Sequence, residues 1–156
     1  MNWELIHNMS KALIAAGCFW GIEEYFRKIN GITNTKVGYS GGFSSNPSYE
    51  EVCLGITGHA ETIFIEFNKE ELSYEDIMHH FFKCHDPTQL NRQGPDIGTQ
   101  YRSAIFYYNN YQKNIADIVK EEVQKNIRKT IVTEIVKANK FYLAETYHQE
   151  YLKKRI

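Results

Sequence analysis

The sequence predicts an α/β protein of the two-layer type (α+β), in which helices pack on a mixed β-sheet. Short stretches rich in β-branched and aromatic residues alternate with longer stretches whose apolar residues recur at helical spacing. No internal repeat, low-complexity tract or linker interrupts this alternation, and 156 residues suit a single domain. We therefore expect residues 1–10 to form an N-terminal arm and residues 11–156 to form one domain.

The predicted strands follow apolar or alternating patterns, at residues 11–16, 35–39, 61–67, 103–108 and 130–136. The predicted helices begin at Cys18, Tyr49, after the cap Ser73, after Asn109 or Asn110, and at Ala144. The first of them stops at Gly31 and the last runs to Lys153 with Tyr147 and Tyr151 on one face. Residues 90–100 have no period and form a long loop.

Composition and charge narrow the class of protein. The formal net charge of −1 gives no long-range attraction to nucleic acid or to an anionic membrane. No apolar run approaches the roughly 20 residues that a membrane-spanning helix needs. Three cysteines without regular spacing argue against a disulfide scaffold and for a reducing compartment. The sequence thus predicts a cytoplasmic protein with neither a nucleic-acid nor a membrane partner.

The segment Gly17-Cys18-Phe19-Trp20-Gly21 is the strongest candidate for chemistry. Cys18 lies where a predicted strand passes into a predicted helix, and unpaired backbone N–H groups collect at a helix start. With the positive end of the helix dipole, they favour a thiolate over a thiol. A lone cysteine is more often a small buried hydrophobe, but two glycines and two large aromatics are a poor way to build a core.

A carboxylate stands at the head of the clearest predicted strand. With a period of two, Glu61 shares a face with Ile63, Ile65 and Phe67. Desolvation on that face would raise the pKa of Glu61 and make it a proton donor near neutral pH. The pattern equally fits a Glu61 that reaches water from the frayed end of the strand; the donor would then be Asp96 or a tyrosine.

Two further segments carry residue types that suggest a function. The loop at residues 90–100 would carry Asp96 and Tyr101 to the start of a strand, and loops of this length are often functional. His80 and Cys84 have the i,i+4 spacing of metal ligands, with His79 and His85 beside them. No second pair with ligand spacing occurs elsewhere, so we expect no metal site.

Six strings in order along the chain resemble motifs of the A-type peptide methionine sulfoxide reductases. They are GCFWG (17–21), GYSGG (38–42), NPSYEEVC (46–53), GHAE (58–61), HDPT (85–88) and QGPDIGTQYRSAI (93–105). The resemblance covers roughly residues 11–153. It implies a ferredoxin-like βαβ core and thiol-dependent reduction of methionine S-sulfoxide, free or in proteins, as a repair of oxidative damage.

The resemblance also implies a role for each matching residue. Cys18 matches the nucleophile, which would become a sulfenic acid, and Phe19 and Trp20 match the cage for the methyl group. Tyr49 and Tyr101 match the hydroxyls that hold the sulfoxide oxygen. Glu61 matches the acid and Asp96 a supporting polar residue. No cofactor is implied beyond an external thiol reductant, either thioredoxin or glutathione with glutaredoxin.

The chain departs from the family pattern at one point. Many members carry recycling cysteines near the C-terminus, whereas here no cysteine follows Cys84. We therefore expect a one-cysteine cycle, with Cys53 as the better internal candidate should a disulfide form. Two rival functions stay open on the sequence: a cysteine peroxidase, which would not need the aromatic cage, and a redox sensor or sulfoxide-binding module without turnover.

Overall fold

The computed structural model describes residues 9–155 and is built around one mixed sheet. The strands of this sheet lie in the order β7-β6-β1-β3-β2-β8. Their bounds are β1 Met9–Ala16, β2 Ile32–Ser40, β3 Ala60–Asn68, β6 Ser103–Tyr107, β7 Glu134–Lys137 and β8 Phe141–Leu143. Only β6 and β7 pair in parallel; the other neighbours are antiparallel. A separate two-stranded hairpin consists of β4 Arg92–Gln93 and β5 Asp96–Ile97.

The connections give the ferredoxin-like core that the motifs implied. Strands β1 and β2 flank β3, and helix α2 (Phe19–Arg27) joins them; β3 and β6 flank β1, and α4 (Tyr74–Lys83) lies between them in sequence. Each unit is a split βαβ with one antiparallel strand in the gap. Helix α5 (Asn110–Gln124) then connects β6 to its parallel neighbour β7. The predicted α+β class with a mixed sheet is confirmed.

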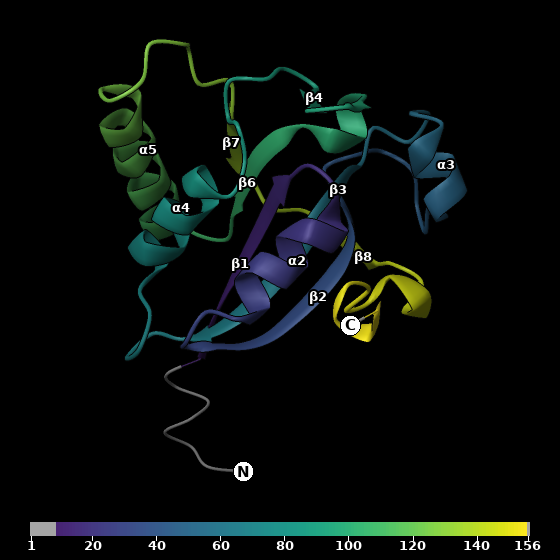
Figure 1. The fold of residues 1–156 in the computed structure, drawn as a ribbon, viewed down its shortest axis with the longest axis horizontal. Coiled ribbons are helices and arrows are strands. Elements are labelled where there is room, and N and C mark those ends of the chain that lie inside the picture. The colour runs from purple at the N-terminus through teal and green to yellow at the C-terminus, as the bar shows by residue number, and fades with distance from the viewer. Residues whose placement is uncertain (1–8, 156) are drawn as a thin grey trace.

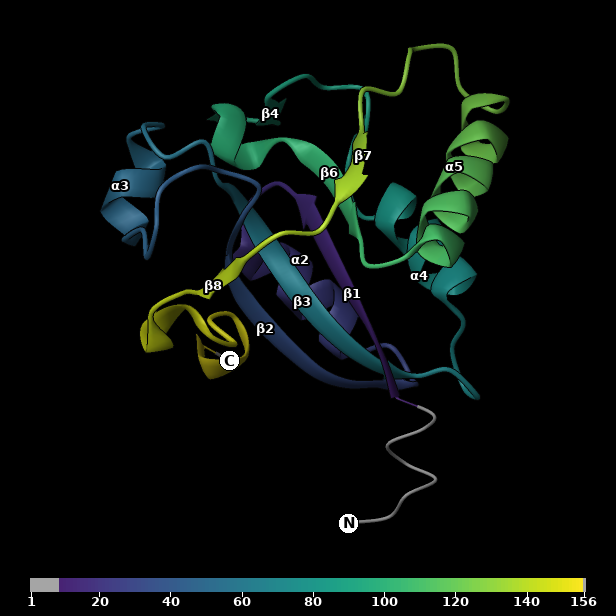
Figure 2. The same ribbon diagram turned by 180° about the vertical axis from the view of Figure 1, so that it is seen from behind.

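The two faces of the sheet are covered differently. Helices α2, α4 and α5 lie on one face, over the main buried cluster, which includes Ile14, Phe26, Ile65 and Phe81 (Figure 1). On the other face, the segment between β7 and β8 crosses the sheet without a helix (Figure 2). Phe141 packs there on a smaller buried cluster. The structure therefore has one helical layer, as a two-layer fold requires.

Capping residues in the sequence predicted most of the helix starts correctly. Ser73 caps α4 in a capping box with Asp76, and Asn109 caps α5. Ser48 forms a second capping box with Glu51 at the start of α3 (Tyr49–Cys53). These helices begin where side-chain oxygens can accept the unpaired N–H groups, which is a property of adjacent residues.

The predicted C-terminal helix is wrong. Between Ala144 and Lys153 the structure has only a 3-10 turn, η2 (Thr146–His148), followed by turns and η3 (Lys153–Arg155). Glu150 has φ 49°, which no α-helix accommodates. The side chain of Gln149 instead bonds to both the N–H and the C=O of Val37 in β2. Tertiary contacts therefore override the helical spacing here.

Several strand boundaries also differ from the prediction; β2, for example, begins at Ile32 and not at residue 35. The strand expected at residues 130–136 begins at Glu134, because the Val132 N–H bonds to the carbonyl of Pro87 and not to the sheet. Met9 and Ser10, which were placed in the N-terminal arm, belong to β1. The rest of that arm, residues 1–8, lies outside the described residues. Strand β8 was not predicted, nor was the short hairpin β4–β5 in the segment 90–100 that was expected to be a loop.

Candidate active site

Cys18 lies between β1 and α2, at the position that the sequence predicted. It is the residue before the first turn of α2, and its carbonyl accepts the Ile22 N–H at 3.4 Å. Gly17 makes the turn into the helix with φ 99°, and a Cβ there would lie 2.9 Å from the side chain of Gln93. The glycine is needed both for this backbone conformation and for the close approach of the loop that follows α4.

The protonation state of Cys18 differs from the prediction. Burial raises the pKa of the Cys18 thiol to about 11, and the negative charge of Glu61 acts in the same direction. The N–H groups of Trp20 and Gly21 favour the thiolate, but less strongly. The expectation that the helix start would produce a thiolate is therefore wrong for the resting site. Loss of water around the sulfur outweighs two backbone dipoles.

Glu61 lies inside the protein, as the strand period suggested. It is 2 % exposed, stands opposite Tyr39 in the β2–β3 pairing, and accepts the Phe19 N–H at 3.0 Å. Burial raises its pKa to about 7, with a smaller contribution from the charge of Asp96. Of the two interpretations of Glu61, the one in which it reaches water is wrong, and the carboxyl can hold or release a proton near neutral pH.

Polar groups from separate elements gather around Cys18 and Glu61. Burial and the charge of Glu61 raise the pKa of Tyr101, in the turn η1 (Thr99–Tyr101), to about 12. The charges of Cys53, Asp96 and Cys18 contribute to the same shift. Both tyrosines of the expected set therefore keep their protons, because burial also raises the pKa of Tyr49. Protonated hydroxyls can donate to an oxygen bound between them.

Aromatic rings form the apolar side of the site. Phe19 is 1 % exposed and stacks at 6.4 Å on Tyr49, the first residue of α3. The Trp20 indole is covered on one face by Tyr151, with ring centres 3.9 Å apart and planes 9° from parallel. The indole N–H donates to Nδ1 of His148 at 2.9 Å. Phe19 and Trp20 thus belong to one aromatic cluster next to Cys18 in the chain.

Three residues contact the site although no sequence pattern pointed to them: Glu145, His148 and Tyr151. All three come from the C-terminal segment that was predicted to be a helix. An indole N–H that is partly buried needs an acceptor, so Trp20 signals that a partner exists. It does not identify His148, which lies 128 residues away in sequence.

The cysteine and histidines near the end of α4 do not share a metal-binding geometry. His80 pairs with the hydroxyl of Tyr25, while His85 bonds to Ser103 and to the carbonyl of Phe81. Within residues 9–155, one group does bring three ligand atoms within 4.8 Å of one another, on α4 and α5: Glu75, His79 and Glu122. It shares no residue with the candidate active site.

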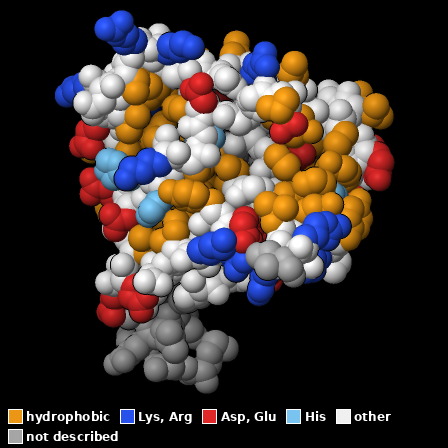
Figure 3. All heavy atoms as spheres, in the orientation of Figure 1, with side chains coloured by type: hydrophobic (Ala, Val, Ile, Leu, Met, Phe, Trp, Pro, Cys, Tyr) orange, Lys and Arg blue, Asp and Glu red, His pale blue; other side chains and the backbone are white. Residues whose placement is uncertain are grey.

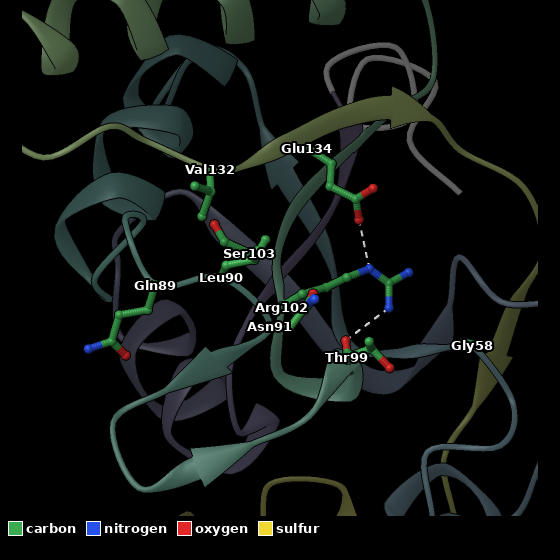
Figure 4. A pocket seen from close by; sticks show the side chains of 9 residues that line it. All are labelled: Gly58, Gln89, Leu90, Asn91, Thr99, Arg102, Ser103, Val132 and Glu134. Atoms are coloured by element: carbon green, nitrogen blue, oxygen red, sulfur yellow. Dashed lines mark hydrogen bonds and ion pairs between the residues drawn. The ribbon is translucent and has the colours of Figure 1, made fainter.

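Arg102 holds the loop that carries Tyr101. Its guanidinium pairs with Glu134 of β7 at 2.7 Å and donates to the Thr99 carbonyl at 2.9 Å (Figure 4). These residues line a cavity of about 390 Å³ beside the site, to which none of the predicted site residues contributes. The cavity is therefore lined by the residues that hold the Tyr101 loop, and not by the predicted site residues.

The surface around the site is apolar. Hydrophobic side chains gather on the side of the molecule that holds α3 and the C-terminal segment (Figure 3). Leu54 after α3 is 73 % exposed and Tyr147 is 53 % exposed. Among the described residues, no helix is both long and apolar enough to cross a membrane.

Comparisons with known proteins agree with this geometry. Residues 10–156 match the family model described as peptide methionine sulfoxide reductase. The chain is 52 % identical over 149 residues to "Peptide methionine sulfoxide reductase MsrA" of Methanosarcina acetivorans, covering 94 % of this chain and 79 % of that protein.

Solved structures of Mxr1 from Saccharomyces cerevisiae share the fold. The reduced form has a TM-score of 0.91 and 38 % identity, covering 95 % of this chain and 86 % of that one. Mxr1 in complex with Trx2 has a TM-score of 0.66 and 26 % identity, covering 93 % and 86 %. The chain therefore belongs to the peptide methionine sulfoxide reductase family.

Proposed function

We propose that the chain reduces methionine S-sulfoxide, free or in proteins, to methionine, with Cys18 as the nucleophile. The observation that carries this proposal is the position of Glu61, a buried carboxyl with its pKa raised to about 7, beside the Cys18 thiol. A sulfoxide sulfur is a weak electrophile until its oxygen accepts a proton. A neutral carboxyl next to the sulfur nucleophile supplies that proton.

Each group in the site has a role in this step. The hydroxyls of Tyr49 and Tyr101 hold the sulfoxide oxygen, with Asp96 in support, and Glu61 protonates it. The Cys18 sulfur attacks the substrate sulfur, and its thiol proton passes to the Glu61 carboxylate, which has given its own proton to the oxygen. Methionine departs, the oxygen stays on Cys18 as a sulfenic acid, and two electrons have passed from the cysteine to the substrate. Phe19 and Trp20 hold the methyl group.

The sulfenic acid is then returned to the thiol by an external reductant in a one-cysteine cycle. Two thiols supply two electrons and two protons, which gives a disulfide, water and the Cys18 thiol. Cys84 is a poor internal partner, because it is packed against Phe81 and donates to its carbonyl at 3.2 Å. The complex of Mxr1 with Trx2 supports thioredoxin as a reductant; glutathione with glutaredoxin is the other candidate.

The three free cysteines, Cys18, Cys53 and Cys84, suit a cytoplasmic location, where thiols stay reduced. No bound cofactor takes part in the proposed cycle. The apolar surface around the site suits methionine sulfoxide in the exposed segments of oxidised proteins.

The test is turnover of separate S and R epimers of a methionine sulfoxide substrate with dithiothreitol, followed by mass spectrometry of the product. The proposal expects loss of one oxygen from the S epimer. A peroxidase would consume hydrogen peroxide and leave the sulfoxide intact, and a binding module would release no methionine.

Recycling is tested by one turnover without reductant. One methionine per site and a sulfenate on Cys18 are expected. A crosslinked Cys18–Cys53 or Cys18–Cys84 peptide as the main product would contradict the one-cysteine cycle.

A further inference from the structure

Glu145 joins three segments that lie far apart in sequence. One oxygen of its carboxylate accepts the hydroxyl of Tyr39 at 2.9 Å, and the other accepts the backbone N–H of Tyr49 at 3.0 Å. Tyr39 is in β2 and Tyr49 begins α3, whereas Glu145 follows β8. Both bonds are made by one side chain, so β2, α3 and the C-terminal segment are fixed relative to one another.

Helix α3 needs such an attachment. It has five residues, Tyr49–Cys53, and a helix of this length is not stable by itself in water. Its cap Ser48 satisfies the N–H of Glu51, which leaves the N–H of Tyr49 for Glu145. At the other end, the side chain of Gln100 donates to the carbonyl of Cys53 at 3.1 Å. The helix is thus held at both ends by side chains from other parts of the chain.

Tyr39 links the same carboxylate to the opposite wall of the site. Its ring is fully buried, lies 5.8 Å from the ring of Phe19, and stands opposite Glu61 in the β2–β3 pairing. A shift of the Tyr39 ring would therefore move the packing around both Phe19 and the strand position of Glu61. The Glu145 carboxylate hydrogen-bonds to Tyr39 and Tyr49 and not to Cys18, so it acts on the sulfur through these neighbours.

We propose that Glu145 is a positioning residue of the reductase site, where it fixes the Tyr49 hydroxyl and the Tyr39 ring against Cys18 and Glu61. The inference rests on the proposed function, because it assigns importance to the place of Tyr49 at the substrate oxygen. Glutamine at this position can accept from the Tyr49 N–H and donate to the Tyr39 oxygen, so it keeps the bridge without the charge. Alanine removes the bridge.

The experiment compares Glu145→Ala and Glu145→Gln with wild type under steady-state conditions. We expect Glu145→Ala to lose about 10-fold to 100-fold in kcat/KM, the effect of a lost charged hydrogen bond, with Glu145→Gln recovering most of the loss. Glu150→Gln is the matched control: it is the same substitution five residues later, and its carboxylate pairs with Lys153 at 2.9 Å near the surface. It should behave as wild type.

A double-mutant cycle with Tyr49→Phe separates positioning from general damage. If Glu145 acts in part through the Tyr49 hydroxyl, Glu145→Ala should cost clearly less in kcat/KM once that hydroxyl is absent, and the remaining loss reports on Tyr39. Alkylation of Cys18 by iodoacetamide does not depend on the Tyr49 hydroxyl. Its rate, followed by peptide mapping, should therefore stay within about 2-fold of wild type in Glu145→Ala.

The outcomes are distinguishable. Losses that multiply fully in the double variant, or an equally slowed alkylation of Cys18, would overturn the positioning role of Glu145. A Tyr49→Phe variant with wild-type activity would instead contradict the proposed role of Tyr49 at the oxygen. A folded Glu145→Ala with wild-type kcat/KM would overturn the inference directly.

Discussion

Two carboxylates at this site, those of Glu61 and Glu145, each accept the first backbone N–H of a helix, and yet their pKa values shift in opposite directions. Glu61 accepts the N–H of Phe19, the first residue of α2, and Glu145 accepts the N–H of Tyr49, the first residue of α3, both at 3.0 Å. Burial raises the pKa of Glu61 to about 7. At Glu145, burial also acts upward, but hydrogen bonds from Tyr49 and Tyr39 leave the pKa below its ordinary value.

The difference shows what a helix N-terminus can and cannot do. A single backbone N–H does not keep Glu61 ionised when the side chain is 2 % exposed and Asp96 is nearby. Glu145 is half-buried and has a second donor, so the same N–H is enough. Desolvation therefore decides which carboxyl is available as an acid and which stays a fixed anion.

The largest effect is expected from the sulfur beside Glu61. Cys18→Ser should abolish reduction of the S-sulfoxide, because the serine hydroxyl is a far weaker nucleophile and cannot take the oxygen as a sulfenic acid. Cys53→Ser and Cys84→Ser should keep most of the first-turnover rate, measured as methionine released per site. Substantial reduction by Cys18→Ser would remove the basis for assigning Glu61 as its acid.

Glu61→Gln tests the protonated member of the pair. We expect a loss on the order of 10²-fold or more in the chemical step, the usual contribution of a general acid. In wild type, the step that needs neutral Glu61 should slow as the pH rises through about 7, and this limb should be absent in Glu61→Gln. Single-turnover rates across pH 5–9 check both points; an unchanged rate would transfer the role to Asp96 or a tyrosine.

Trp20→Ala tests whether the aromatic part of the site contributes to activity independently of the carboxylates. Loss of the ring that packs between His148 and Tyr151 should raise KM and lower turnover, together by roughly 10-fold. The pH dependence should keep the limb assigned to Glu61, because that carboxyl is untouched. Bulky dialkyl sulfoxides turned over as fast as methyl sulfoxides by wild type would argue against a methyl cage.

The same contrast between the two carboxylates is expected in the free energy of unfolding. A pKa raised from 4.5 to about 7 means that folded Glu61 binds more protons than unfolded Glu61, so its contribution to stability declines as the pH rises through this window. The decline is on the order of 3 kcal/mol. Glu61→Gln should flatten that part of a pH series of urea unfolding curves.

Glu145 should behave in the opposite way in the same measurement. Its lowered pKa means that its stabilising contribution is present above the ordinary pKa of a glutamate and is lost as the pH falls through its value in the folded protein. Glu145→Gln should therefore differ from wild type least at acid pH. If Glu61→Gln and Glu145→Gln changed the free energy of unfolding with the same pH dependence, the contrast between the two carboxylates would be contradicted.

The sequence by itself determined the class of fold and the place of Cys18, the proposed nucleophile. Alternating and helical periods predicted most of the strands and helices, and capping residues located the starts of α4 and α5, whereas the ferredoxin-like topology was implied by the family resemblance. The glycines around Cys18 marked a strand-to-helix turn, and strand parity put Glu61 on the apolar face of its strand, although it left burial and solvent exposure equally open. These features follow from neighbouring residues, which is why no tertiary information was needed.

Only the tertiary structure decided the protonation state of Cys18 and the conformation of the C-terminal segment that contacts the site. The Cys18 thiol, predicted to ionise, keeps its proton because other elements bury it. The segment after Ala144 is not a helix, because Gln149 bonds to Val37 across 112 residues and Glu145 bonds to Tyr49 across 96. Solvent exclusion and contacts between distant segments depend on the packed chain, and no local pattern encodes them.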